Sequence, residues 1–418
     1  MMIRRSRWGG ITAGVGVTAA LVLAAGCSSS GASSSSGSGT STVQMDVLGY
    51  DNGVQAWANQ TMKGFNASHP GVKLQITVVP PDNLEQVLTT QVQGGDPPDI
   101  SSMATAWVPS FAKADALQDV RKIAPASFLA KFNNNLLSGS VYQGQLASLP
   151  YGASARALFY NTAEFAKAGI TSPPQTWAEL AQDAAKIQST HAAKYGFALQ
   201  GTGAEVFSAW FPYFYWSYGG SFGTGSSLQV QNNACVTGLT QLNNLVNVAK
   251  VTEPNPTSFD ATQLYGAFTS GDAAMTITGP WLVGMAQGHV KFGVSAIPAG
   301  TASATLGVTD GWAVFKHSKA SSSQINQVLQ YLLSPSVENP FLVGRGFLPV
   351  IQSSFSLSSF STADMKPFVS LLSSARFAPQ NAQWSSFINQ GGKALQGMYV
   401  NGTSPTSVCS AIEGFAGS

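Results

Sequence analysis

The sequence predicts an α/β protein of two domains, of which the first is doubly wound. Residues 43–49 alternate and are β-rich, residues 54–68 have helical periodicity, and residues 72–79 form a second strand. A strand, a helix and a strand in succession indicate a parallel sheet. About 375 residues follow the N-terminal segment, more than one hydrophobic core normally organises, so two domains are expected.

The N-terminal segment predicts export and a lipid anchor. Three arginines precede a short apolar stretch whose last small residues suit a signal peptidase. Cys27 follows at once, as in a bacterial lipobox. We therefore expect residues 1–26 to be a lipoprotein signal peptide, and residues 27–42 to be the acylated cysteine with a Ser/Gly tether. An ordinary secretory signal, cut nearby, is the alternative.

The charge balance argues against a nucleic-acid partner. The first 27 residues hold three arginines and no acid, so 18 basic and 19 acidic groups remain, a net charge of about −1. The rest of the chain has no Lys/Arg cluster. No apolar run after the signal is long enough for a membrane helix, so membrane contact is expected through the lipid alone.

Two further cysteines, Cys235 and Cys409, remain in a protein that is expected outside the cytoplasm. They could form a disulfide in that compartment or stay as two separate thiols. The Cys and His residues do not have the spacing of a zinc site, and we expect neither a metal nor another cofactor.

The α/β alternation continues along the chain. A capping box of Thr176 and Glu179 predicts a helix start. The other expected elements are helices at 84–93, 161–168, 180–188, 236–248 and 265–268, and strands entering at 99–100 and spanning 158–160. Asp99, after two prolines, is expected to brace its turn rather than to bind a ligand.

An unusual density of aromatic rings lies between residues 202 and 225. Trp210 and Tyr213 would share one helical face, and Phe211, Tyr215 and Tyr218 another. Each single ring is more simply explained by core packing. The whole cluster, rich in Trp and Tyr, could also provide a partly wet ligand surface.

Five motifs in order resemble one family. They are Gly-Asp-Pro-Pro-Asp-Ile at 95–100, Leu-Pro-Tyr at 149–151 leading to Leu-Phe-Tyr-Asn at 158–161, Pro-x-Thr-Trp-x-Glu-Leu at 174–180, residues 268–281 ending in Gly-Pro-Trp, and Gly-Trp-Ala at 311–313 followed by Gly-Phe-Leu-Pro at 346–349. These motifs are similar to those of the extracytoplasmic solute-binding proteins of ABC importers, in the sugar-binding group that includes maltose-binding protein.

The resemblance implies two doubly wound α/β lobes joined by crossing hinge strands, with a ligand cleft between them that closes by hinge motion. We expect residues 43–150 and 275–314 to form the N-terminal lobe, and residues 151–274 and 315–418 the C-terminal lobe. The first crossing is expected near residues 151–156.

The same resemblance implies the ligand contacts. Trp281 and Trp384 match positions where the family stacks sugars, and both are expected to bind a sugar face without being needed for folding. Asp51 and Asp310 offer carboxylates that can accept sugar hydroxyls. The other expected site residues are Asn52, Gln55, Trp107, Tyr151, Trp210, Tyr213, Gly311, Trp312 and Arg345.

The specificity stays open at the sequence level. Where the maltose-binding branch has a Trp and an Asp-Arg pair, this chain reads Ser-Met-Ala-Thr-Ala-Trp at 102–107. Arg345 could bind hydroxyls or an anion, or form a surface salt bridge. A di- or oligosaccharide and a glycerol-phosphate-type solute are both compatible with these residues.

The resemblance implies a monomeric binding protein, anchored to the outer face of the bacterial membrane, that delivers its ligand to ABC permease subunits. A glycan receptor without transport would use the same cleft. A glycosidase would need paired carboxylates, which only Asp51 and Asp310 could provide. The sequence has no Gly-x-Ser-x-Gly elbow, phosphate loop or catalytic His arrangement, so we expect no enzyme activity.

Overall fold

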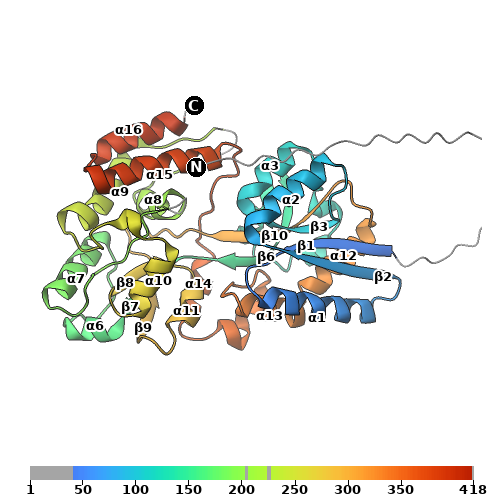
Figure 1. Ribbon diagram of the computed structural model, residues 1–418, viewed down its shortest axis with the longest axis horizontal. Coiled ribbons are helices and arrows are strands. Elements are labelled where there is room, and N and C mark those ends of the chain that lie inside the picture. Colours follow the sequence, from blue (N-terminus) through green and yellow to red (C-terminus); the bar gives the residue numbers. More distant parts are fainter. Residues whose placement is uncertain (1–40, 203–205, 224–226, 417–418) are drawn as a thin grey trace, which may run out of the picture. The chain divides into compact units, whose positions relative to one another are not determined.

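The first lobe is built on a five-stranded sheet in the order β2-β1-β3-β10-β6 (Figure 1). The computed structural model describes residues 41–202, 206–223 and 227–416. β1 runs parallel to β2 and β3, whereas β10 is antiparallel to β3 and β6. The strands are β1 (Ser41–Leu48), β2 (Val72–Val79), β3 (Ile100–Ala104), β6 (Ser148–Ser154) and β10 (Val308–Val314).

Helices cover both faces of this sheet because its strands carry apolar side chains on both sides. Val43, Met45 and Val47 belong to a core shared with α1, α12 and α13, while Leu48 and Met103 belong to a second core with α2 and α3. The first lobe is therefore doubly wound, as predicted. The helices are α1 (Gly53–Ser68), α2 (Pro81–Gln93), α3 (Val108–Lys113), α12 (Ser322–Leu332) and α13 (Pro335–Val343).

The second lobe is built on the sheet β8-β7-β9, in which β7 (Ala157–Asn161) pairs antiparallel with β8 (Met275–Thr278) and β9 (Phe292–Ser295). A large aromatic core joins the surrounding helices. These helices are α6 (Thr162–Lys167), α7 (Trp177–Ser189), α8 (Phe211–Ser217), α9 (Asn232–Asn243), α10 (Ala261–Thr269), α15 (Trp384–Asn401) and α16 (Pro405–Ala416).

Local sequence signals predicted several element boundaries correctly. The strand at 72–79 has the expected limits. Thr176 accepts a hydrogen bond from the Glu179 amide at 3.1 Å, and the Glu179 carboxylate accepts one from the Thr176 amide at 3.3 Å, which completes the capping box. The Asp99 carboxylate accepts hydrogen bonds from Gln44 and from the 318–320 turn, as a bracing residue should.

Two of the expected lobe boundaries do not match the strand pairing. Residues 275–314 were expected in the first lobe, but β8 and β9 pair with β7 in the second sheet, and only β10 belongs to the first. Within 315–418, α12 and α13 pack on α1 in the first lobe, and α15 and α16 lie in the second. Motif order cannot reveal these extra crossings, because pairing partners are far apart in the sequence.

The N-terminal predictions lie largely outside the described residues. The signal peptide at 1–26 and Cys27 are not among them, whereas Ser41 and Thr42, expected in the tether, begin β1 instead. Among the residues that the structure describes, no helix combines the length and the apolar character needed to cross a membrane.

A disulfide joins Cys235 in α9 to Cys409 in α16, with Cα atoms 5.8 Å apart. Both cysteines are fully buried in the aromatic core of the second lobe. The bond therefore ties the last helix of the described chain to a helix 174 residues earlier.

A buried acid in the second lobe makes stability depend on pH. Burial raises the pKa of the Glu253 carboxyl to about 7, and its Oε1 has no hydrogen-bond partner among the described residues. The folded state therefore binds the carboxyl proton of Glu253 more tightly than the unfolded chain does. Glu253 is protonated in both states below about pH 4.3, and stability is lost as the pH rises from there through about 7.

We expect the protein to be more stable at pH 5 than at pH 8, by on the order of 1–3 kcal/mol from this carboxyl. Urea unfolding at the two pH values measures the difference. Glu253→Gln keeps the shape without the charge, so it should reduce the difference. An identical pH dependence in this variant would contradict the assignment.

Candidate functional site

A cavity of about 270 Å³ lies between the two lobes. The first lobe provides the end of β3 and part of β10, and the second lobe provides residues before α8 and the start of α15. A connecting segment at 377–381 closes one side. We call this space the interlobe cavity; its polar and aromatic lining includes Thr105, Arg156, Ser208, Asp310, Gln380, Asn381 and Trp384.

Asp310 supplies the carboxylate of the interlobe cavity. It lies in β10 where the pairing with β6 shifts register, and its Oδ2 accepts a hydrogen bond of 2.9 Å from the Tyr50 hydroxyl. Burial raises the pKa of Asp310 to about 6, although the Tyr50 hydrogen bond and the charge of Arg156 act in the opposite direction. The group is therefore an anion at neutral pH.

Arg156 brings a positive charge to the same cavity and was not predicted as a site residue. Its guanidinium donates a hydrogen bond to Ser154 Oγ at 2.8 Å and lies 4.7 Å from the ring centroid of Trp281. Its backbone is fixed by two hydrogen bonds with the Thr305 hydroxyl. The sequence signal that could have identified Arg156 as a site residue is its position in the predicted crossing at 151–156, because a residue in a crossing segment can face both lobes.

Trp281 and Arg345 line a second cavity, of about 440 Å³. Trp281 donates from Nε1 to the Tyr265 hydroxyl at 2.8 Å. The adjoining loop requires Gly346, because φ is +66° there and a Cβ would lie 2.6 Å from the Trp281 Cα. This loop thus contacts Trp281, and the Trp281 ring in turn contacts Arg156, which lines the interlobe cavity.

Arg345 forms the ion pair that the sequence left as one of its possible roles. Its Nη2 lies 3.1 Å from Asp51 Oδ1, and its Nη1 donates to the Phe341 carbonyl at 2.6 Å. The guanidinium also lies 4.4 Å from the Phe341 ring centroid. Since Asp51 neutralises much of its charge, Arg345 is held as part of the wall of this cavity.

Several predicted ligand rings pack inside the lobes. Trp312 stacks on Tyr151 with centroids 3.9 Å apart, and both are buried. Trp210 and Tyr213 are buried in the second-lobe core, as are most of the rings around them. The aromatic cluster therefore packs mainly as core, and the described residues of this stretch that line the interlobe cavity are Ser208 and Ala209.

The remaining predicted residues lie at other places. Gly311 is buried where a Cβ would be 2.6 Å from Ser148 Oγ, and Trp107 packs partly buried beside α3. Asn52 and Gln55 are exposed at the start of α1. Of the predicted set, Asp310 and Trp384 line the interlobe cavity, and Trp281 and Arg345 line its neighbour.

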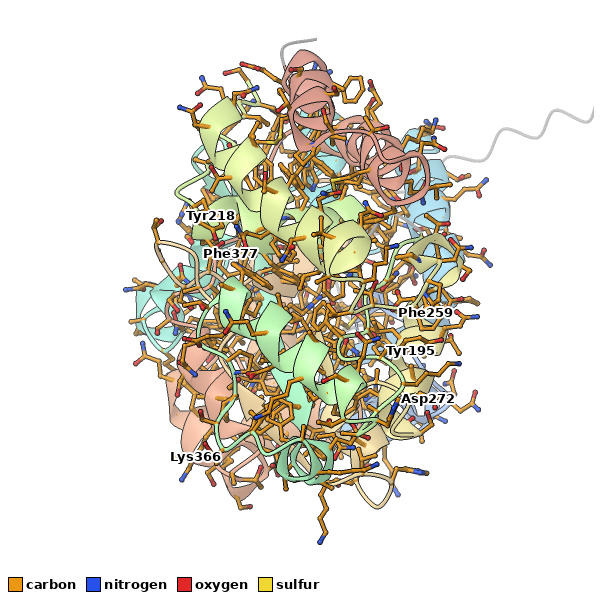
Figure 2. The ribbon with its side chains drawn as sticks, turned by 90° about the vertical axis from the view of Figure 1, so that its left-hand side faces the viewer. Tyr195, Tyr218, Phe259, Asp272, Lys366 and Phe377 are labelled. Carbon is orange, nitrogen blue, oxygen red and sulfur yellow. A yellow bond between two sulfur atoms is a disulfide. The ribbon has the colours of Figure 1, made fainter. Side chains whose placement is uncertain are left out.

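A third cavity, of about 860 Å³, shares the 377–381 segment as a wall. Phe377, labelled in Figure 2, lines both this cavity and the interlobe cavity. Lys113 and Arg376 line it, and its described lining has no carboxylate. The Arg376 guanidinium lies 5.2 Å from the Trp216 ring centroid.

The sequence matches the family described as bacterial extracellular solute-binding protein over residues 50–339. A binding protein of Brucella abortus (strain 2308) is 33% identical over 381 residues, covering 88% of this chain and 90% of the relative. The sn-glycerol-3-phosphate-binding periplasmic protein UgpB of Yersinia pestis is 25% identical over 318 residues, covering 70% of this chain and 71% of the relative.

Solved structures share the fold. The cyclic alpha-maltosyl-1,6-maltose binding protein from Arthrobacter globiformis superposes with a TM-score of 0.80 at 23% identity, covering 91% of this chain and 98% of that one. UgpB from Mycobacterium tuberculosis in complex with glycerophosphocholine gives a TM-score of 0.75 at 16% identity, covering 90% and 98%. The predicted periplasmic-binding-protein-like fold is thereby confirmed.

Proposed function

Because the chain belongs to the bacterial extracellular solute-binding protein family, we propose that it captures a small neutral carbohydrate in the interlobe cavity and delivers it to an ABC permease. The observation that carries this proposal is a cavity lined by both lobes whose lining includes an aspartate, an arginine and a tryptophan, Asp310, Arg156 and Trp384. Sugars present hydroxyls that both donate and accept hydrogen bonds, together with apolar ring faces. These three groups match that chemistry.

The size of the cavity favours a small ligand. About 270 Å³ lies just below the range of about 300–1,000 Å³ that small-molecule sites usually have. A mono- or disaccharide fits this volume better than a long oligosaccharide. The neighbouring cavity beside Trp281 offers room for a longer solute if the lobes open around Arg156.

A glycerol-phosphate-type solute is the second candidate. Arg156 lines the interlobe cavity and Arg345 lines the cavity beside Trp281, and the Yersinia relative is named for sn-glycerol 3-phosphate binding. Asp310 and Asp51 weigh against this candidate, because each places a carboxylate near one of the arginines. An ionised phosphate in the interlobe cavity would be repelled by the Asp310 carboxylate.

A glycosidase is disfavoured by the geometry. Asp310 is the one acid among the described residues that line the interlobe cavity, while Asp51 is paired with Arg345. A glycosidase needs two carboxyl groups on either side of the bond that is cleaved. The family relatives are likewise named as binding proteins.

The cellular part of the proposal follows from the N-terminal sequence. We infer that Cys27 is acylated and anchors the protein outside the cytoplasm, which fatty-acid labelling of the wild type and of Cys27→Ser would check. A receptor that senses the same solute without transport is the alternative. Loss of solute uptake on deletion of the gene would favour transport.

The binding prediction is tested by thermal unfolding of residues 41–418 with glucose, maltose, trehalose, sn-glycerol 3-phosphate and glycerophosphocholine, followed by calorimetry. A ligand at a hundred times its Kd should stabilise the protein by about 2.7 kcal/mol. We expect at least one neutral sugar to do so. Stabilisation by the phosphate compounds alone would support the second candidate. If none of the sugars raised the unfolding temperature, the carbohydrate proposal would be contradicted.

A further inference from the structure

Two tyrosine hydroxyls and one carboxylate form a hydrogen-bonded chain at the interlobe cavity. The Tyr50 hydroxyl lies 2.6 Å from the Tyr151 hydroxyl and 2.9 Å from Asp310 Oδ2. A hydroxyl has one proton to donate, and an ionised carboxylate can only accept. Tyr50 must therefore donate to Asp310, and Tyr151 must donate to Tyr50. We call these three residues the Tyr-Tyr-Asp relay.

The relay joins three separate segments of the first lobe, and neighbouring rings pack against its tyrosines. Tyr50 follows β1, Tyr151 lies in β6, and Asp310 lies in β10. The Tyr151 ring stacks on Trp312, and the Tyr50 ring contacts Phe347 edge-on with centroids 5.4 Å apart. The rings that the sequence offered as ligand contacts thus support the relay.

The charged groups around Asp310 leave it as an acceptor facing the cavity. Among the described residues, Tyr50 after β1, Tyr151 in β6 and Arg156 after β6 are the titratable groups that interact with it. Arg345 lies beyond the tyrosines and is paired with Asp51. Burial holds the pKa of both tyrosines well above the usual value, so they remain neutral donors.

The carboxylate has lone pairs to spare for a solute. A carboxylate offers about four acceptor positions, and Tyr50 occupies one of them. Within the described part of the chain, no other side chain donates a hydrogen bond to Asp310. One solute hydroxyl could therefore donate to Asp310 while a neighbouring hydroxyl accepts from Arg156.

We propose that the Tyr-Tyr-Asp relay positions Asp310 as a hydroxyl acceptor and makes the cavity selective for neutral solutes with adjacent hydroxyls over phosphate-bearing ones. This inference rests on the proposed function, since it takes the interlobe cavity as the solute site. Tyr50 and Tyr151 act through Asp310 and are positioning residues. Asp310 itself contacts the solute.

The test compares Tyr50→Phe with Tyr195→Phe, a matched control in the second lobe whose ring contacts Phe259 (Figure 2). Calorimetry measures the Kd of the sugar that stabilises the wild type between pH 4.5 and 8. Wild-type affinity should fall as the pH drops through about 6, because Asp310 becomes protonated. Asp310→Asn should weaken binding by about tenfold to a hundredfold and abolish this dependence.

Tyr50→Phe should weaken binding by about tenfold and shift the fall in affinity to higher pH, because the ionised carboxylate loses a stabilising hydrogen bond. Tyr151→Phe should shift the pH at which affinity falls in the same direction but by less. Tyr195→Phe should have the Kd and the pH profile of the wild type. If Tyr50→Phe and Tyr195→Phe gave the same Kd and the same pH profile, the relay would be refuted.

A measurement without solute separates the relay from the proposed function. Carboxyl signals of ¹³C-labelled aspartates are titrated by NMR, with the Asp310 signal assigned from Asp310→Asn. The Asp310 pKa should be higher in Tyr50→Phe than in the wild type. An unchanged value overturns the relay even when sugars bind normally. Binding of glycerol 3-phosphate or glycerophosphocholine alone overturns the proposed function and the selectivity, whatever the titration shows.

Discussion

Trp384→Ala should lower the free energy of unfolding by about 3–5 kcal/mol and weaken solute binding as well. Trp384 is 4% exposed, and its ring lies 5.0 Å from the Phe222 centroid and 5.6 Å from that of Phe387. Removing it leaves a cavity in the second-lobe core and takes away one of the aromatic rings that line the interlobe cavity. Urea unfolding and calorimetry measure the two effects.

This expectation differs from the one drawn from the sequence, in which Trp281 and Trp384 would both serve binding without being needed for folding. Trp281 is partly exposed and is the matched comparison. Trp281→Ala loses the hydrogen bond to Tyr265 and the contact with Arg156, so its stability loss should be smaller. Wild-type stability in Trp384→Ala would show that its ring is not part of the core.

The double variant Cys235→Ala/Cys409→Ala should lose about 2–5 kcal/mol of stability, toward the upper end of that range. The disulfide closes a loop of 174 residues, and the entropy removed from the unfolded chain grows with loop length. Alanine avoids placing a hydroxyl in the fully buried site. Urea unfolding with and without dithiothreitol measures the effect.

The reductant provides an internal control for this prediction. Wild-type stability should fall in dithiothreitol, whereas the double variant should not respond. Solute affinity at low temperature should stay unchanged, since neither cysteine lines the described cavities. Two free thiols in the purified exported protein, with no response to reductant, would contradict the bond.

The residues of the proposed site could be predicted only in part from the sequence. The residues that could be named belong to local motifs, whereas the others depend on contacts between distant parts of the chain. Asp310 precedes a recognisable Gly-Trp motif and Trp384 follows a proline at a family spacing, so both could be named. Tyr50 and Arg156 acquire their roles through contacts with residues 260 and 125 positions away, Asp310 and Trp281. No local pattern encodes such contacts.

The same reasoning explains the misplaced rings. Trp312, Trp210 and Tyr213 carry the residue types that sugar sites use, and a sequence cannot tell a ring that faces a cleft from one that faces a core. In the structure Trp312 stacks on Tyr151, and the other two lie in the second-lobe core. Whether such a ring faces the core or a cleft depends on what packs against that side of its helix or strand.

The sequence by itself determined the features that depend on near neighbours or on ordered motifs. These are the α/β alternation, the Thr176 capping box, the bracing role of Asp99 and the solute-binding family. Only the tertiary structure decided which lobe holds β8, β9, α12 and α13, and which polar groups meet at the interlobe cavity. Helix caps and periodicity act over a few residues, whereas strand pairing joins segments as distant as Ile100 and Val314, and only the folded chain brings them together.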